Sequence, residues 1–339
     1  MTLSTPPVVL LDLAVATAGP GAPWLPDAAT AAEVAEAAER AGITALRILD
    51  ETPEATTLDA TVLAGHLAGR TSTLGYLVDV RTSHHAPYNL ARRLLSLDRA
   101  SGGRTGLVLR PGEGDEVSAA VAPDQAASDP ALRWQEYAAI LLRLWESFPA
   151  EALVGDQEAG VFVRDELIAP ISHDGSFYRV NGALDGPSSV QVRPLHVVAD
   201  TDVLSWDQVA ATADLVIVDR DRAPGADQAL GAALRRVGRD RADVALVGRT
   251  AVDPAVLRFP QALTTDLRSW AARDGLDGFD LVPLAEGPGS VGASALAILE
   301  TVVPLLGSRT GATLREATGS VPAPAETAGA GTTSVEVAS

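Results

Sequence analysis

The chain has 339 residues, a formal net charge of −18 at pH 7 and no cysteine, and all 26 of its basic residues are arginine. The missing thiols exclude disulfides and cysteine metal sites, and the missing lysines exclude Schiff-base chemistry and a P-loop phosphate lysine. The strong negative charge argues against nucleic acid as a partner, because phosphate neutralisation needs a basic surface. The length allows one large α/β barrel or two average domains.

The first apolar run, Val8 to Ala18, is interrupted by Asp12 and is too short to span a bilayer. The residues before it carry no basic start, so we do not expect a secretory signal or a membrane anchor. We interpret the run as a buried strand and expect a cytoplasmic enzyme.

Apolar strands then alternate with amphipathic helices, which is the pattern of repeated β-α units around a parallel sheet. Eight strand-helix units are expected, and this number favours a closed (β/α)₈ barrel. The expected pairs are 8–18 with 28–41, 44–49 with 58–68, 73–80 with 87–97, 105–109 with 132–147, 195–198 with 206–213, 214–218 with 227–237, 244–247 with 261–273, and 278–282 with 294–306.

The stretch from Arg81 to Thr105 is the most informative part of the chain. It predicts a strand end, a polar turn of Thr82, Ser83, His84 and His85, and a helix that begins near Pro87. Proline is tolerated in a first helical turn, and Ser101-Gly102-Gly103 supplies a left-handed stop. The polar turn therefore lies at the carboxyl end of a strand, where α/β barrels bind their ligands.

Three stretches depart from the alternation. We expect 112–129, which is polar and acidic, to form a mobile loop over the strand ends, and 148–186 to be an insertion. The Pro/Ala/Gly-rich segment 318–339 has little to bury and is expected to be disordered, which leaves 1–317 as the barrel domain.

The sequences of several segments resemble those of one protein family. Pro87-Tyr-Asn-Leu-Ala-Arg-Arg93, Leu144-Trp-Glu-Ser147, His173-Asp-Gly-Ser-Phe-Tyr-Arg-Val-Asn-Gly182 and Asp277-Gly-Phe-Asp-Leu-Val-Pro283 resemble, in order, the luciferase-like flavin monooxygenases of the nitrilotriacetate monooxygenase branch. The similarity runs from about Ala28 to Leu314. The resemblance implies a (β/α)₈ barrel with an insertion at 148–186.

The resemblance also implies a two-component oxygenase. A partner flavin reductase supplies reduced FMN, and the cofactor and O₂ oxidise a small organic substrate while the protein holds the ring and excludes water. The family implies a homodimer through helices near 58–68 and 87–97. The residues that it implies around the cofactor are Asp50, Thr82, Ser83, Arg110, Trp134, Ala199, Asp200 and Thr201.

The adjacent histidines His84 and His85 are the candidate catalytic residues. With an ordinary pKa near about 6.5, an imidazole can hydrogen-bond reacting oxygen or act as a general base. Alternatively, one histidine caps the following helix and the other is solvated. A metal site is disfavoured, because neighbours on a strand point to opposite sides and no carboxylate cluster accompanies them.

Two turns differ in sequence from what is usual in the family. Arg110-Pro111 follows the fourth strand, and Ala199-Asp-Thr-Asp202 stands where the family places an amide-rich phosphate turn. Carboxylates at Asp200 and Asp202 would repel a phosphate. Alternatively, they serve as helix caps, with Asp202 the candidate cap. Arg110 or Arg193 could also compensate their charge. A non-catalytic homologue that acts as a partner subunit, and a barrel that uses a deazaflavin, therefore stay open as alternatives.

A further glycine-rich segment, 287–292, matches Gly-x-Gly-x-x-Gly. It follows the last expected strand and lacks the remainder of a dinucleotide-binding fingerprint. The segment is either a plain turn or a lining for the phosphate end of a ligand, as loops after the last barrel strands often are.

Overall fold

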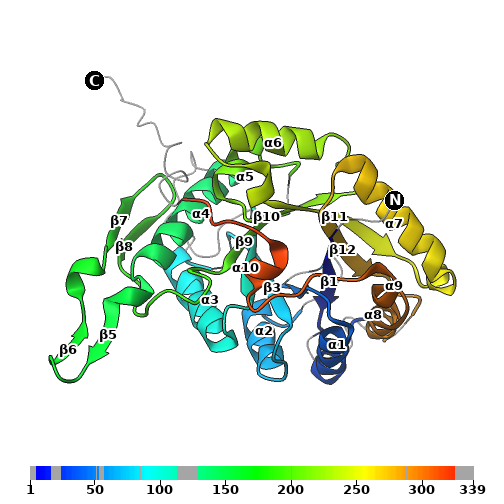
Figure 1. Ribbon diagram of the computed structural model, residues 1–339, viewed down its shortest axis with the longest axis horizontal. Coiled ribbons are helices and arrows are strands. Elements are labelled where there is room, and N and C mark those ends of the chain that lie inside the picture. Colours follow the sequence, from blue (N-terminus) through cyan, green and yellow to red (C-terminus); the bar gives the residue numbers. More distant parts are fainter. Residues whose placement is uncertain are drawn as a thin grey trace.

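The computed structural model describes residues 5–16, 24–50, 52, 57–83, 85–112, 129–199, 201–287 and 289–324. Eight parallel strands close into a barrel in the order β1-β12-β11-β10-β9-β4-β3-β2, with helices around it (Figure 1). The predicted (β/α)₈ fold is confirmed. The barrel strands are β1 (Val8–Ala14), β2 (Ala45–Leu49), β3 (Gly75–Arg81), β4 (Thr105–Arg110), β9 (Leu195–Val198), β10 (Leu215–Asp219), β11 (Ala245–Val252) and β12 (Gly278–Pro283).

The helices follow the strands as expected, with one difference at the end. A single helix was expected over 294–306, but the chain forms two, which meet at Val302 just before Pro304 because proline cannot continue the backbone ladder. The helices are α1 (Ala28–Ala41), α2 (Ala60–Ala68), α3 (Pro87–Ser101), α4 (Pro130–Glu146), α5 (Trp206–Thr212), α6 (Ala226–Arg236), α7 (Pro260–Asp274), α8 (Ser290–Thr301), α9 (Val303–Leu306) and α10 (Leu314–Thr318).

Helix α3 begins and ends where the sequence predicts. Pro87 occupies the first turn, and Gly102 ends the helix with a φ of 71°, a conformation that glycine adopts without strain. Leu90 and Leu94 are fully buried on its inner face. The polar turn before α3 is therefore fixed on both sides by regular structure.

Two apolar cores hold the barrel together. The larger lies between the strands and the surrounding helices. The smaller fills the barrel interior and includes Val8, Leu10, Leu77, Val108, Leu215 and Val247. Leu314 of α10 joins this inner core, so α10 closes the amino-terminal end of the barrel. The interior is thus packed from below, which leaves only the carboxyl ends of the strands for ligands.

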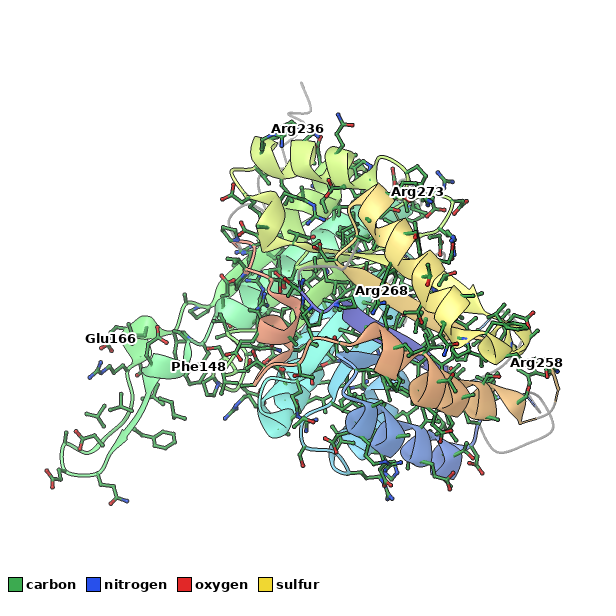
Figure 2. All side chains as sticks on the ribbon, turned by 45° about the vertical axis from the view of Figure 1, so that its right-hand side comes forward. Phe148, Glu166, Arg236, Arg258, Arg268 and Arg273 are labelled. Carbon is green, nitrogen blue, oxygen red and sulfur yellow. The ribbon has the colours of Figure 1, made fainter. Side chains whose placement is uncertain are left out.

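The insertion after α4 forms two β-hairpins instead of barrel elements. Strands β5 (Leu153–Asp156) and β6 (Val161–Val163) form the first, and β7 (Ile171–Asp174) and β8 (Arg179–Gly182) form the second. The first projects from one side of the molecule, beyond Phe148 and Glu166 (Figure 2). The second packs along α4.

The segment after α10 differs from the expected disordered tail over its first residues. Thr318, Ser320 and Ala323 are buried. Arg193 Nη2 donates to the Ala323 carbonyl at 2.7 Å, and the Val321 N–H donates to the Asp243 carbonyl at 2.9 Å. These bonds fasten the segment under the barrel, and residues 325–339 lie outside the described part of the chain.

Among the residues that the structure describes, no helix combines the length and the apolar character needed to cross a bilayer.

Candidate functional site

A layer of charged side chains, buried except for the half-buried Arg249, lies in the barrel beneath the carboxyl ends of the strands. We call Asp12, Arg47, Asp79, Arg249 and Asp280 the charged layer. Arg47 is at its centre: its Nε donates to Asp79 Oδ2 at 3.0 Å, and its Nη1 donates to Asp280 Oδ2 at 2.9 Å. Arg249 Nη2 donates to Asp12 Oδ2 at 3.0 Å. These side chains take the place that bulky apolar residues usually fill in a barrel.

Burial and mutual attraction perturb these groups strongly. Burial alone would lower the pKa of Arg47, but the carboxylates of Asp12, Asp79 and Asp280 outweigh it and raise that pKa well above its ordinary value. Burial raises the pKa of Asp79 against the opposing attraction of Arg47 and Arg110. Burial, reinforced by Asp12, raises the pKa of Asp280 to about 8. Perturbed carboxyl groups in a cleft are typical of functional sites.

A cavity of about 370 Å³ opens above this layer, over the ends of β1, β2 and β12. Among the described lining residues, Asp12 contributes the one ionisable side chain, and Thr52 is also polar. The remaining lining residues are apolar: Ala14, Trp24, Leu25, Leu49, Val282, Pro283, Leu284, Ala285 and Val291. A concave, mostly apolar cavity with one polar anchor is the usual form of a small-molecule site.

The polar turn after β3 lies at the same end of the barrel, above the neighbouring strands. Thr82 and Ser83 are buried, and Thr82 Oγ1 accepts a hydrogen bond from the Gly112 N–H at 3.1 Å. Ser83 approaches Gly112 so closely that a Cβ there would lie 2.3 Å from Ser83 Oγ. His85 is half-buried, and its carbonyl accepts a hydrogen bond from Tyr137 Oη at 2.8 Å. Thr82, Ser83 and His85 are therefore held by these contacts, while His84 lies outside the described residues.

The second hairpin of the insertion brings Tyr178 to this turn. Glu136 of α4 accepts hydrogen bonds from the Phe177 and Tyr178 N–H groups at 3.1 and 2.8 Å, and its Oε1 lies 2.9 Å from His173 Nε2. The Tyr178 ring meets Tyr137 edge to face at 5.3 Å. The insertion thus reaches the polar turn, where Tyr178 Oη donates to the Thr82 carbonyl at 3.5 Å, and the buried Glu136 helps to hold it there.

Asp50 and Trp134 have mainly structural contacts. Asp50 Oδ1 accepts a hydrogen bond from the Ala60 N–H at 3.0 Å, at the start of α2. Trp134 has no exposed surface; its Nε1 donates to the Leu109 carbonyl at 2.8 Å, and its ring packs on His196. Trp134 therefore lies in the core behind β4, where it supports the strand without reaching the cavity.

The turn after β9 corrects one expectation. Helix α5 begins at Trp206 with Ser205 as its N-cap, in a reciprocal capping box with Gln208. Asp202 is exposed and does not cap the helix. Ala199 and Thr201 are half-buried at the barrel mouth, and Asp200 lies outside the described residues.

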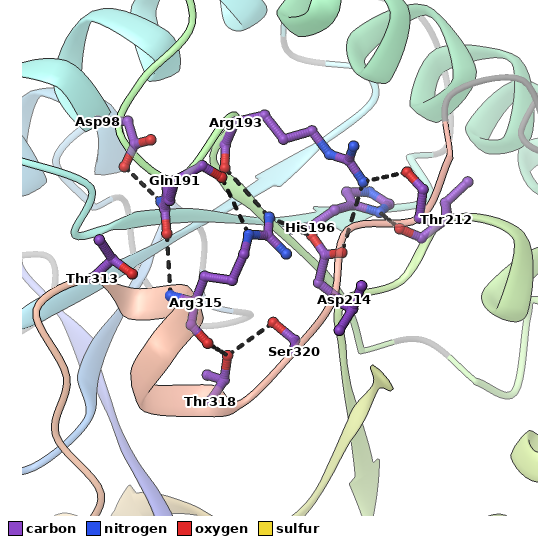
Figure 3. Close-up of polar contacts among 12 residues, drawn as sticks. Asp98, Gln191, Arg193, His196, Thr212, Asp214, Thr313, Arg315, Thr318 and Ser320 are labelled. Atoms are coloured by element: carbon purple, nitrogen blue, oxygen red, sulfur yellow. Dashed lines mark hydrogen bonds and ion pairs between the residues drawn. The ribbon is translucent and has the colours of Figure 1, made fainter. Parts of the chain in front are cut away.

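The two arginines considered as phosphate partners lie at opposite ends of the barrel. Val108 of β4 pairs with Val197 of β9, so two residues further along Arg110 lies beside Ala199. Arg193, which is labelled in Figure 3, precedes β9 and is buried at the closed end. It binds Glu146 and Ala323. Only Arg110 is therefore placed near the turn after β9.

The sequence did not predict which residues line the cavity, although it contains a pattern that indicates the charged layer. Asp12, Arg47, Asp79 and Asp280 each interrupt a short apolar strand that is otherwise buried. A charge inside such a strand needs a partner, and strands of a barrel face one another. Which strands supply the partners depends on closure of the barrel. Among the described side chains, no group of three or more His, Asp or Glu is arranged to hold a metal ion.

Comparison with known proteins matches the family model of luciferase-like monooxygenases to residues 8–273. The chain is 26% identical over 191 residues to N-acetyl-S-(2-succino)cysteine monooxygenase of Bacillus subtilis (strain 168), which covers 55% of this chain and 43% of that protein. It is 28% identical over 161 residues to nitrilotriacetate monooxygenase component A of Aminobacter aminovorans, covering 47% of this chain and 36% of that protein. The matched stretches thus span less than half of either relative.

Among solved structures, the EDTA monooxygenase of Chelativorans sp. BNC1 superposes with a TM-score of 0.77 at 19% identity, covering 94% of this chain and 98% of the other. This likeness shows a shared fold over nearly the whole barrel. The match of the family model covers most of the sequence, including the motifs around α3 and α4. The chain belongs to the luciferase-like monooxygenase family.

Proposed function

We propose that this protein is a flavin-dependent monooxygenase that uses reduced FMN, delivered by a separate reductase, and O₂ to oxidise a small organic substrate. The observation that carries the proposal is the apolar cavity of about 370 Å³ at the carboxyl ends of β1, β2 and β12, in a chain of this family. The named relatives are monooxygenases, one of them of nitrilotriacetate, which supports a small organic molecule as the class of substrate.

The cavity fits an apolar ring system and its substrate. Leu49, Val282 and Pro283 offer aliphatic surface and no competing charge. Bound FMNH₂ would supply two electrons to O₂, so that one oxygen atom enters the substrate and the other leaves as water. The protein's own contribution is to exclude water and to place polar groups around the reacting atoms.

Arg110 is our candidate for the phosphate end of FMN. It ends β4 beside Ala199, and an arginine binds a phosphate by two parallel hydrogen bonds. The Thr201 hydroxyl is a further donor in the same turn. Asp200 and Asp202 act against this site by repulsion, so we expect the affinity for FMN to be set by the balance between them and Arg110.

Around the reacting atoms we propose Thr82, Ser83 and His85, with His84 as the alternative imidazole. Thr82 and Ser83 supply hydroxyls at the end of β3, and His85 is held through its carbonyl by Tyr137. An imidazole there is suited to hydrogen-bond reacting oxygen or to move a proton. Asp50 acts indirectly, by holding the start of α2, and Trp134 acts indirectly, by holding the end of β4.

We also propose a homodimer through α2 and α3. Helix α2 keeps an apolar residue, Val62, 69% exposed on its outer face, which supports contact with another surface there. Sedimentation of the purified protein tests this point, and a monomer at micromolar concentration would exclude it.

Anaerobic titration with FMNH₂ and with FMN tests the function. We expect saturable binding of FMNH₂ at micromolar concentrations, weaker binding in Arg110→Leu, and tighter binding in Asp202→Ser. Leu49→Trp, which fills the cavity, should abolish binding, whereas Val154→Trp on the exposed first hairpin is the matched control and should leave it unchanged. No binding up to millimolar FMNH₂ would favour the non-catalytic partner subunit.

Turnover is then measured with a flavin reductase, NADH and ¹⁸O₂ on a panel of small organic sulfides, amines and ketones. One ¹⁸O atom in the product would establish monooxygenation, because a hydrolase or dehydrogenase incorporates none from O₂.

A further inference from the structure

The charged layer contains more acid than its arginines neutralise. We propose that Asp12 and Asp280 hold one proton between them at the floor of the cavity, and that Asp12 presents it to the hydrogen-bond acceptor of a neutral, largely apolar ligand. The shared proton is inferred from the side chains alone. The identification of the ligand as the oxygenation substrate rests on the proposed function.

The two carboxyl groups lie on neighbouring strands, β1 and β12, where Asp280 pairs with Leu10 and Asp12 follows two residues further along β1. Each directs its Oδ2 to an arginine. Each also has a buried Oδ1 that receives no hydrogen bond from a donor in the described part of the chain. Both carboxyl groups contact the same two arginines. Arg47 Nη1 lies 2.9 Å from Asp280 Oδ2 and 3.7 Å from Asp12 Oδ1, and Arg249 lies 3.0 Å from Asp12 Oδ2 and 3.7 Å from Asp280 Oδ2. Two carboxylates so placed repel each other, and one bound proton removes one of the two negative charges.

The charges that face the pair are consistent with one bound proton. Every barrel strand except β9 contributes a charged group to the layer or its rim: Asp12, Arg47, Asp79, Arg110, Asp219, Arg249 and Asp280. Three carboxylates and two guanidinium groups form the layer itself, and Arg110 and Asp219 at the rim offset each other. One proton therefore makes the whole set neutral, which a buried site strongly favours.

The perturbed acidity agrees with this placement. Burial and the neighbouring Asp12 raise the pKa of Asp280 to about 8, against the attraction of Arg47 and Arg249. The pair is therefore expected to keep its proton at neutral pH and to lose it in mildly alkaline solution.

The position of Asp12 allows the proton to reach a ligand in the cavity. Asp12 lines the cavity, whereas Asp280 is fully buried behind it. Asp12 is thus the group that touches a ligand, and Asp280 is a positioning residue. A neutral floor offers no net charge to a cation or an anion, but its acid proton can bind a carbonyl or similar oxygen. The geometry points to a neutral substrate with one acceptor group and an apolar body.

Infrared difference spectroscopy detects the proton directly. At pH 7 we expect a protonated-carboxyl C=O band that disappears as the pH rises through about 8. The band should be lost in Asp280→Asn and in Asp12→Asn, and it should persist in Asp219→Asn, the matched control at the rim. If the wild-type protein shows no such band at pH 7, the shared proton is excluded, and this measurement needs no variant to fold.

Binding of three probes of similar size tests the ligand class without flavin. At pH 7 we expect acetophenone to bind more tightly than ethylbenzene by about fivefold, the factor that one net hydrogen bond supplies, and more tightly than benzylamine, which is a cation. The preference for acetophenone should vanish at pH 9.5 and in Asp12→Leu. Tighter binding of benzylamine, or an unchanged preference in Asp12→Leu, would overturn the assignment.

The two proposals fail separately. A protein that shows the carboxyl band and the acetophenone preference but does not bind FMNH₂ would refute the oxygenase and leave the shared proton intact. A protein that binds FMNH₂ and lacks the band would do the reverse.

Discussion

Glu136 accepts a hydrogen bond of 2.8 Å from the Tyr178 N–H, and this contact joins helix α4 to the tip of the second insertion hairpin. The same carboxylate binds the Phe177 N–H and lies 2.9 Å from His173 Nε2. Through it, a segment that folds outside the barrel reaches the polar turn after β3. Glu136 is therefore a central contact between the barrel and this wall of the candidate site.

Replacement of Glu136 by leucine should lower the free energy of unfolding by about 2 kcal/mol or more. The two N–H groups would lose their acceptor while staying buried, and an unsatisfied buried donor costs about 1–3 kcal/mol. Urea denaturation measures the change, and hydrogen exchange should localise it to 173–180. Glu151→Leu, at an exposed position of the same insertion, serves as the control. Equal stability of the two variants would show that the hairpin is held by other contacts.

Gly175→Ala tests how closely the hairpin approaches α4. A Cβ at this position would lie 2.2 Å from Glu136 Oε1 and 2.5 Å from His173 Nε2, so one of these groups must move. We expect the substitution to loosen the hairpin and to lower the melting temperature. In Gly287→Ala the new Cβ meets nothing within 4 Å, so that variant should melt like the parent. A Gly175→Ala protein with unaltered melting would argue against the tight approach.

His196 makes the stability sensitive to acid. Burial lowers its pKa to about 4, against the opposing effects of Asp214 and the Thr212 carbonyl. Between about pH 6.5 and 4 the unfolded chain binds a proton that the folded chain does not, so stability falls as the pH falls through this window. The loss is on the order of 3 kcal/mol.

The contribution of His196 is measured as the difference between the parent and His196→Phe in unfolding free energy from pH 7 to 4. Burial raises the pKa of Asp98 to about 6, which has the opposite sign but is common to both proteins. We expect a flatter acid limb in His196→Phe and an unchanged one in His66→Gln, whose histidine is exposed. Parallel profiles for all three proteins would remove His196 as the source.

Arg315 fastens α10 to the closed end of the barrel (Figure 3). Its Nη2 donates to Asp214 Oδ2 at 3.1 Å, and its N–H donates to Gln191 Oε1 at 3.1 Å. Arg315→Met would leave the buried Asp214 carboxylate with less compensation, at a cost of about 3 kcal/mol. Arg258→Met, at an exposed position, should cost little in the same denaturation experiment. If Arg315→Met lost less unfolding free energy than Arg258→Met, Arg193 would be the arginine that stabilises Asp214.

The sequence by itself determined the architecture. The alternation of short apolar strands with amphipathic helices, eight times, led to the closed barrel, and Pro87 and Gly102 marked the two ends of α3. These features depend on local backbone preferences and on burial of one face at a time, which the order of residues encodes directly. The motifs around α3 and α4, which lie within the matched residues, added the family assignment that the family model supports.

Only the tertiary structure decided the composition of the site. Asp12 and Asp280 are 268 positions apart and meet because β1 pairs with β12 when the barrel closes. From the sequence, Arg193 and Arg110 were equivalent candidates for the phosphate site, and the direction of β9 puts them at opposite ends of the barrel. Trp134, which was expected near the cofactor, is buried in the core. Such contacts follow from closure and register of the sheet, which depend on all eight strands at once, and no local pattern encodes them.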